Sequence, residues 1–237
     1  MAHNGYERRS GAKETTMSQS EALTIDVVSD VVCPWCYLGK RRLDQALAEV
    51  EGGPIVVRWR PYQLDATIPS EGLDRRAYMK KKFGDEARLT AVHDRLAMLG
   101  AEVGIAYDFE AIKRAPNTMD AHRLVRWSVA AGSQGQVVER LFQLYFEQGR
   151  DIGDRALLVE VARENGMDGE VIEKLLREGD DIDAVQAEIA QAQSVGVTGV
   201  PFFIFAQRLG VSGAQDVDVL VKAIAQARAS LSGVEVA

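Results

Sequence analysis

Segments with strand character lie near the two ends of this chain, and a long helical stretch separates them. Residues 22–32, ALTIDVVSDVV, form an apolar, β-branched run that is typical of a buried strand. Residues 54–64 begin with PIVVRW, whose alternation predicts a second strand. Between them, apolar residues recur at helical spacing until Gly52 and Gly53. The first third of the chain therefore predicts a strand–helix–strand unit.

From about residue 73 to residue 194 the pattern predicts helices only, since successive segments carry a 3.6-residue apolar stripe and most end at glycine. Strand character returns at residues 199–215, where FFIF and RLGVSG are separated by AQ, as in a β-hairpin. A closing amphipathic helix follows. We therefore predict an α/β fold in which a domain made of residues 22–70 and 195–232 is interrupted by an all-helical insertion, residues 71–194.

Composition excludes some classes of partner. The formal net charge is −7, so no net positive field attracts nucleic acid. No window reaches the roughly 18–20 apolar residues that cross a bilayer, so we expect no membrane partner. Residues 1–21 contain no apolar signal-peptide core and are expected to be a disordered leader. We therefore predict a cytoplasmic protein, and in that compartment a disulfide is usually transient and catalytic or sensing.

Both cysteines of the chain lie in one segment, CPWC, as Cys33 and Cys36. Pro34 favours the first position of a helix, which makes Cys33 the N-cap and brings its sulfur to the first free N–H groups and the positive end of the helix dipole. A thiolate is stabilised there relative to a thiol. Cys36 lies nearly one turn further, within bonding reach and facing inward. We therefore predict that Cys33 attacks a disulfide and Cys36 resolves the mixed disulfide.

A cysteine pair of this spacing has three other uses. A structural zinc site needs four ligands, and the three histidines are not spaced to complete one, so we predict no metal site. Covalent haem attachment requires histidine directly after the second cysteine, where this chain has Tyr37. An inert buried pair remains an alternative. It accounts poorly for a proline at the first position of a helix that follows a strand.

These motifs carry a family resemblance over residues 22–230. CPWC after a strand, a helical insertion and the late GVTGVPFF resemble thioredoxin-fold oxidoreductases of the DsbA family. The segments SDVVCPWCYLGKRRL and NTMDAHRL are similar to its cytoplasmic, FrnE-like branch. The resemblance implies that the discontinuous α/β domain is thioredoxin-like. It also implies that Pro201 follows a cis peptide bond beside the redox pair, and that the backbone of Val200 accepts a substrate strand.

A few further residues are candidates for the site. Pro34 and Trp35 lie between the cysteines, where an exposed aromatic ring favours contact with a substrate. Asp30 precedes Cys33 by three residues and is a candidate acid or base; Asp26, on the same strand, is a weaker one. His122, in NTMDAHRL, is either functional or an ordinary helix residue with a satisfied ring. Lys40, further along the first helix, is expected to be solvated.

The leading hypothesis is a thiol–disulfide oxidoreductase or isomerase that acts on protein or small-molecule thiols and disulfides. We expect no bound cofactor, with glutathione or another thiol as a redox partner. An alternative is a glutathione-dependent isomerase of a small organic substrate, similar to 2-hydroxychromene-2-carboxylate isomerase; such enzymes typically lack the full cysteine pair. A third is a non-catalytic module that senses redox state. The direction of exchange depends on the reduction potential, which a sequence does not supply.

Overall fold

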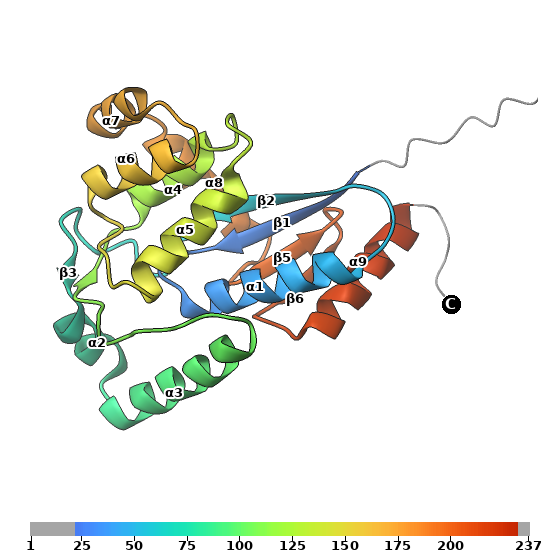
Figure 1. The fold of residues 1–237 in the computed structure, drawn as a ribbon, viewed down its shortest axis with the longest axis horizontal. Helices are drawn as coiled ribbons and strands as arrows, with labels where there is room; N and C mark the ends of the chain where they lie inside the picture. The colour runs from blue at the N-terminus through green and yellow to red at the C-terminus, as the bar shows by residue number, and fades with distance from the viewer. Residues whose placement is uncertain (1–21, 232–237) are drawn as a thin grey trace, which may run out of the picture.

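Strands from the two ends of the chain form one sheet in the computed structural model, which describes residues 22–231. The sheet order is β2-β1-β5-β6, with β1 Leu23–Ser29, β2 Ile55–Pro61, β5 Phe202–Phe205 and β6 Leu209–Ser212. Strand β1 pairs in parallel with β2 and antiparallel with β5, so that Ile25 lies opposite Phe205 (Figure 1). The thioredoxin-like α/β fold interrupted by helices is as expected. The predicted leader, residues 1–21, lies outside the described residues.

Helices α1, Pro34–Glu49, and α9, Val217–Leu231, pack together on one face of this sheet (Figure 1). That face carries the main core, because Ile25 and Val27 of β1 lie opposite Phe205 and Phe203 of β5, and all four are fully buried. Val28 points to the other face and packs with Ala192 of α8. The central strand is thus buried on both sides, which explains its nearly continuous apolar sequence.

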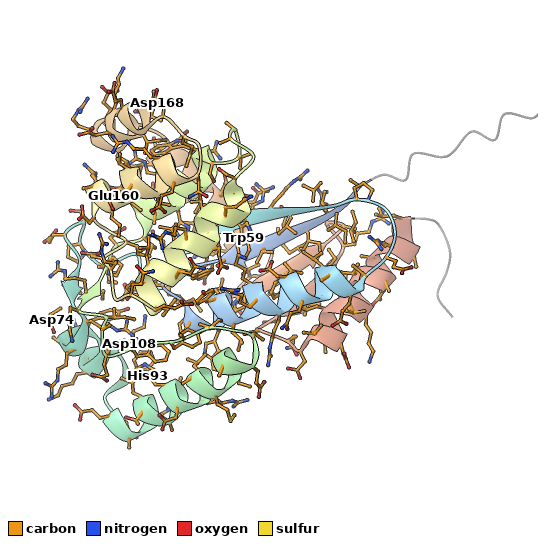
Figure 2. All side chains as sticks on the ribbon, viewed as in Figure 1. Trp59, Asp74, His93, Asp108, Glu160 and Asp168 are labelled. Atoms are coloured by element: carbon orange, nitrogen blue, oxygen red, sulfur yellow. The ribbon has the colours of Figure 1, made fainter. Side chains whose placement is uncertain are left out.

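The interrupting region contains seven helices among the described residues. They are α2 Arg75–Phe83, α3 Glu86–Glu102, α4 Met119–Trp127, α5 Gln134–Phe146, α6 Arg155–Glu164, α7 Gly169–Glu178 and α8 Ile182–Ser194. Several begin at an aspartate that accepts a hydrogen bond from the first turn, including Asp74 before α2 and Asp168 before α7 (Figure 2). Figure 1 shows α4 to α7 gathered toward one end of the sheet, with α2 and α3 apart from them. Helix α8 packs against β2 and the second face of the sheet.

The expectation of helices only in this region was wrong in one respect. Two short strands, β3 Leu73–Asp74 and β4 Arg114–Ala115, pair antiparallel. A strand of two residues is too short to show an alternating pattern, and this pair depends on two chain segments that the fold brings together.

The outer strand β2 does not present a fully open edge to solvent. The side-chain amide of Gln134 accepts a hydrogen bond from Trp59 N–H at 2.9 Å and donates to Trp59 C=O at 3.2 Å, as a neighbouring strand would. This contact ties α5 to the sheet and limits strand addition at that point. Within residues 22–231, no helix combines the length and apolar character needed to cross a membrane.

Candidate active site

Cys33 and Cys36 lie where β1 passes into α1, as the local sequence predicts. Cys33 is the N-cap residue with an extended backbone, and Pro34 opens the helix. The Cys36 N–H donates to Cys33 C=O at 3.0 Å, which places the two cysteines on successive parts of the first turn. Both are free thiols, and both are buried, at 4% and 1% exposure.

The direction of the Cys33 sulfur differs from the simple N-cap expectation. It accepts no hydrogen bond from the first turn of α1. Instead the Cys33 thiol faces the carbonyl oxygen of Val200, at 3.7 Å. A protonated thiol is a donor and therefore turns to a carbonyl, whereas a thiolate would turn to N–H groups. The peptide bond between Val200 and Pro201 is cis, so the cysteine pair and the late proline are neighbours in space.

Cys36 is the inner thiol. Burial, followed by contact with the Cys33 thiol, raises the pKa of Cys36 well above its ordinary value, and the nearby Ser29 hydroxyl opposes this rise. Cys36 is therefore protonated at neutral pH in this reduced state, and it must lose a proton before it can act as a nucleophile.

Close packing holds α1 against the proline segment. A side chain on Gly39, one turn beyond Cys36, would approach Pro201 to 3.0 Å and the ring of Phe203 to 3.2 Å. Only hydrogen fits comfortably at this position, so glycine allows the helix that carries the cysteines to lie directly on the cis-proline strand.

Asp30 belongs to a buried polar cluster behind the cysteines. One carboxylate oxygen accepts the Leu64 N–H at 2.8 Å, and the other lies 3.3 Å from His122 Nε2. The same ring nitrogen lies 2.9 Å from the carbonyl oxygen of Tyr62, which can only accept, so Nε2 carries the proton. The backbone carbonyl of Asp30 also accepts from Cys33 N–H at 2.9 Å. Asp30 thus contacts both α4 and the CPWC segment, residues 33–36, which we call the redox segment.

A pocket of about 500 Å³ opens beside Cys33, and we call it the front pocket. Its wall on the cysteine side includes Asp30, Pro34, Trp35 and Val200. The opposite wall comes from α2 and α3 and carries apolar side chains together with the cationic side chains Arg75, Lys82 and Arg88. Among residues 22–231 none of these three cations forms an ion pair, although Arg75 and Lys82 donate to tyrosine hydroxyls. Hydrogen bonds from Thr67, together with the charge of Lys82, lower the pKa of Asp65. The three cations outnumber the two lining carboxylates, Asp30 and Asp65, so the front pocket offers net positive charge to a ligand.

Trp35 is half-buried, not exposed as its position suggested. It packs against the main core, and the guanidinium of Arg95, from α3, lies 5.9 Å from its ring. Helix α3 covers this side of the redox segment, which explains the difference. Tyr107 adds to the cover by donating a hydrogen bond to the Pro34 carbonyl at 2.6 Å.

The structure gives partners to three further residues named from the sequence, and only the expectation for Lys40 was wrong. Asp26 is paired with Arg60 at 2.7 Å on β2, which assigns it a structural partner. Lys40 was expected to be solvated but is buried, at 7% exposure, and paired with Glu139 of α5 at 2.9 Å. His122 was left open between two readings, and the structure places it on Asp30. Its position in NTMDAHRL was the available signal, but its partner lies 92 residues away.

Comparison with known proteins agrees with this geometry. A family model described as a DSBA-like thioredoxin domain matches residues 24–225. A probable DsbA oxidoreductase from Streptomyces coelicolor is 30% identical, with a TM-score of 0.80 over 91% of this chain and 92% of that chain.

Two more distant structures share the fold. One is a 2-hydroxychromene-2-carboxylate isomerase, at 16% identity and a TM-score of 0.68, covering 90% of this chain and 100% of that one. The other is a cytosolic disulfide reductase from Pseudomonas aeruginosa with glutathione, at 21% identity and a TM-score of 0.56, covering 89% and 98%. The extent of the family match and the Streptomyces likeness establish that the chain belongs to the DSBA-like thioredoxin domain family.

Proposed function

We propose that the protein exchanges disulfides through Cys33 and Cys36. The observation that carries this proposal is the arrangement of two reduced thiols in contact, the outer one beside a pocket and the inner one buried. The Cys33 thiolate attacks a substrate disulfide, forms a mixed disulfide and releases one substrate thiol. Cys36 then loses its proton, attacks the Cys33 sulfur and releases the second thiol. The substrate gains two electrons, and the protein keeps the Cys33–Cys36 disulfide.

Asp30 is proposed as the acid or base for the Cys36 proton. It is 1% exposed, its backbone contacts both cysteines, and it is one of the residues that line the front pocket. Asp30→Asn keeps an oxygen for the Leu64 N–H but cannot take a proton, so it should slow resolution of the mixed disulfide more than its formation. Stopped-flow measurement of the two steps separates them. Equal slowing of both steps would exclude this role.

Glutathione, or another small anionic thiol, is the proposed redox partner. The unpaired Arg75, Lys82 and Arg88 of the front pocket support this, because a carboxylate-bearing thiol would find charge partners there. The fold neighbour with glutathione is a cytosolic reductase, which supports a cytoplasmic setting for this chain. We also propose that the chain belongs to the FrnE-like branch. The NTMDAHRL segment, on which that resemblance rests, carries His122, and His122 contacts Asp30.

The test is an insulin-reduction assay together with trapping of intermediates. Cys33→Ser should abolish turnover. Cys36→Ser should retain the first attack and accumulate a mixed disulfide at Cys33, visible by mass spectrometry as an added glutathione. Equilibration with glutathione buffers then gives the reduction potential, and with it the preferred direction. A Cys33→Ser protein that still reduces insulin would refute the proposal.

A second candidate is a glutathione-dependent isomerase of a small organic acid. The front pocket favours it, since its volume and unpaired cations suit such a substrate, and an isomerase shares the fold. The two candidate functions differ in whether they require Cys36. Isomerisation of 2-hydroxychromene-2-carboxylate, followed by absorbance with glutathione present, should be absent if disulfide exchange is the function. Isomerisation that survives Cys36→Ser would favour the second candidate.

A further inference from the structure

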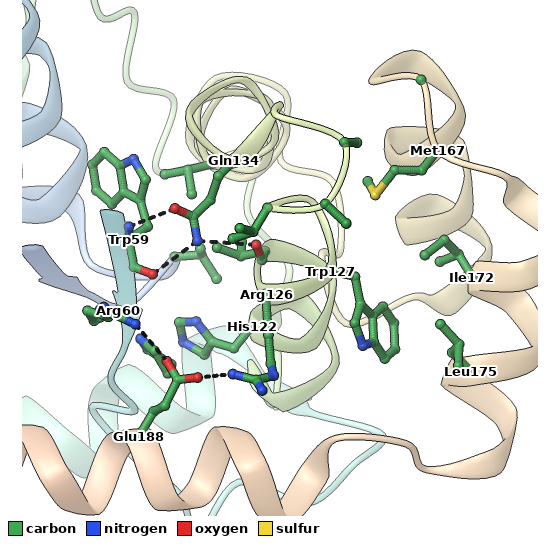
Figure 3. Close-up of a pocket in the computed structure, with 18 of the residues that line it drawn as sticks. Trp59, Arg60, His122, Arg126, Trp127, Gln134, Met167, Ile172, Leu175 and Glu188 are labelled. Atoms are coloured by element: carbon green, nitrogen blue, oxygen red, sulfur yellow. Dashed lines mark hydrogen bonds and ion pairs between the residues drawn. The ribbon is translucent and has the colours of Figure 1, made fainter. Parts of the chain in front are cut away.

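A second cavity lies behind the redox segment, with a volume of about 870 Å³. We call it the rear cavity. Its walls come from β2, α4, α5 and α7, with Glu188 of α8 at one side (Figure 3). Neither cysteine lines it, and of its lining residues none belongs to the front pocket. The rear cavity is therefore a separate space, of a size that holds a small-molecule ligand.

The interior of the rear cavity is mainly apolar and includes aromatic rings. Figure 3 shows Trp127 projecting from α4 toward Met167, Ile172 and Leu175. The Trp127 ring is held in place, because its N–H donates to Asp181 at 2.7 Å and the Arg123 guanidinium lies 4.9 Å from its centre. A fixed indole beside aliphatic side chains favours a flat, ring-containing ligand.

The two arginines that line the rear cavity are already paired with carboxylates. Arg126 binds Glu188, and Arg60 lies 3.8 Å from the same carboxylate (Figure 3). Arg60 also lies 2.7 Å from Asp26. Asp168 is engaged by two N–H groups of the first turn of α7. Among residues 22–231, an anionic ligand would therefore find no free cation here, in contrast to the front pocket, and Asp168, the one lining carboxylate without a cationic partner, lies exposed at the start of α7. The rear cavity therefore suits an uncharged ligand.

The inner wall of the rear cavity touches the redox machinery. Ser29 lines it and is 4% exposed, and its hydroxyl has no hydrogen-bond partner at a good distance and angle. The same hydroxyl lies close enough to Cys36 to oppose the rise in that thiol's pKa. His122 also lines the wall and contacts Asp30. A ligand that displaces either side chain would alter the surroundings of the inner thiol.

We propose that the rear cavity binds an uncharged, ring-containing small molecule, and that its occupancy shifts the equilibrium between the dithiol and disulfide forms of Cys33 and Cys36. The coupling to the redox equilibrium rests on the proposed function, whereas the binding of the ligand does not. By thermodynamic linkage, the shift in the redox equilibrium must equal the ratio of the ligand's affinities for the oxidised and reduced protein.

The test uses N-phenyl-1-naphthylamine, an uncharged fluorescent probe with separate aromatic rings, titrated into the full-length reduced protein. We expect one site per chain. Val171→Trp, at a half-exposed position on the rim of the cavity, should weaken binding at least tenfold. The matched control is Val219→Trp, on the exposed side of α9 and outside the cavity, which should leave affinity unchanged. The sulfonated analogue 8-anilino-1-naphthalenesulfonate should bind the Val171-sensitive site at least tenfold more weakly.

The coupling is measured in glutathione buffers with and without saturating probe. We expect at least a threefold change in the dithiol–disulfide equilibrium, lost in Val171→Trp. Binding that is absent, insensitive to Val171→Trp or stronger for the sulfonated analogue overturns the site. Binding without a redox shift overturns the coupling. A protein whose cysteines never form a disulfide refutes the proposed function, while the titration of reduced protein still decides whether the cavity binds the probe.

Discussion

Removing the ring of His122 is the sharpest test of the buried cluster behind the cysteines. His122→Ala deletes the N–H that faces Tyr62 C=O at 2.9 Å and Asp30 Oδ1 at 3.3 Å. A buried acceptor that loses its donor destabilises the fold by about 1–3 kcal/mol. The contact with Tyr62 is short and the contact with Asp30 is long. Loss of the Asp30 contact should therefore cost about 1 kcal/mol, the low end of this range. We therefore expect a loss of about 2–4 kcal/mol.

The loss is measured by urea unfolding, followed by both tryptophan fluorescence and circular dichroism. For a domain of this size it corresponds to a fall in melting temperature of about 4–16 °C. His122→Gln is the matched control, because its terminal amide can donate near the position of Nε2 and should recover most of the stability. A loss below about 0.5 kcal/mol would show that water from the rear cavity replaces the donor. If His122→Gln is no more stable than His122→Ala, the hydrogen-bond reasoning is also refuted.

Three further predictions concern packing and protonation. Gly39→Val should destabilise the protein by about 1–3 kcal/mol and lower exchange activity, because its side chain overlaps Pro201; thermal unfolding with an activity assay checks this. In Cys33→Ser, alkylation of Cys36 at pH 9 should be much slower than for a free thiol and should accelerate on unfolding in guanidinium, since burial raises its pKa; rapid alkylation of the folded protein would contradict this. Gln134→Leu should cost about 1–3 kcal/mol by freeing the Trp59 backbone groups, and an unchanged urea midpoint would contradict that.

The local geometry of the redox segment follows from the residues of that segment alone. A β-branched run, a cysteine, a proline and an apolar helical stripe specify a strand that passes into a helix with Cys33 at its start, and these preferences act within a few residues. The order of strands and helices was also readable, because long segments carry their period in their own side chains. The two-residue strands β3 and β4 carry no such period and were missed.

The contacts between groups far apart in the sequence depend instead on how the helices and strands pack. The register of β1 against β5 brings the Val200 carbonyl to Cys33, 167 positions away, and the packing of α4 brings His122 to Asp30. The cover of α3 half-buries Trp35, and α5 buries Lys40 by supplying Glu139. Such contacts depend on how whole helices and strands pack, and the residues next to a side chain in the sequence do not predict them. The two pockets, one with unpaired cations and one with paired charges, arise for the same reason.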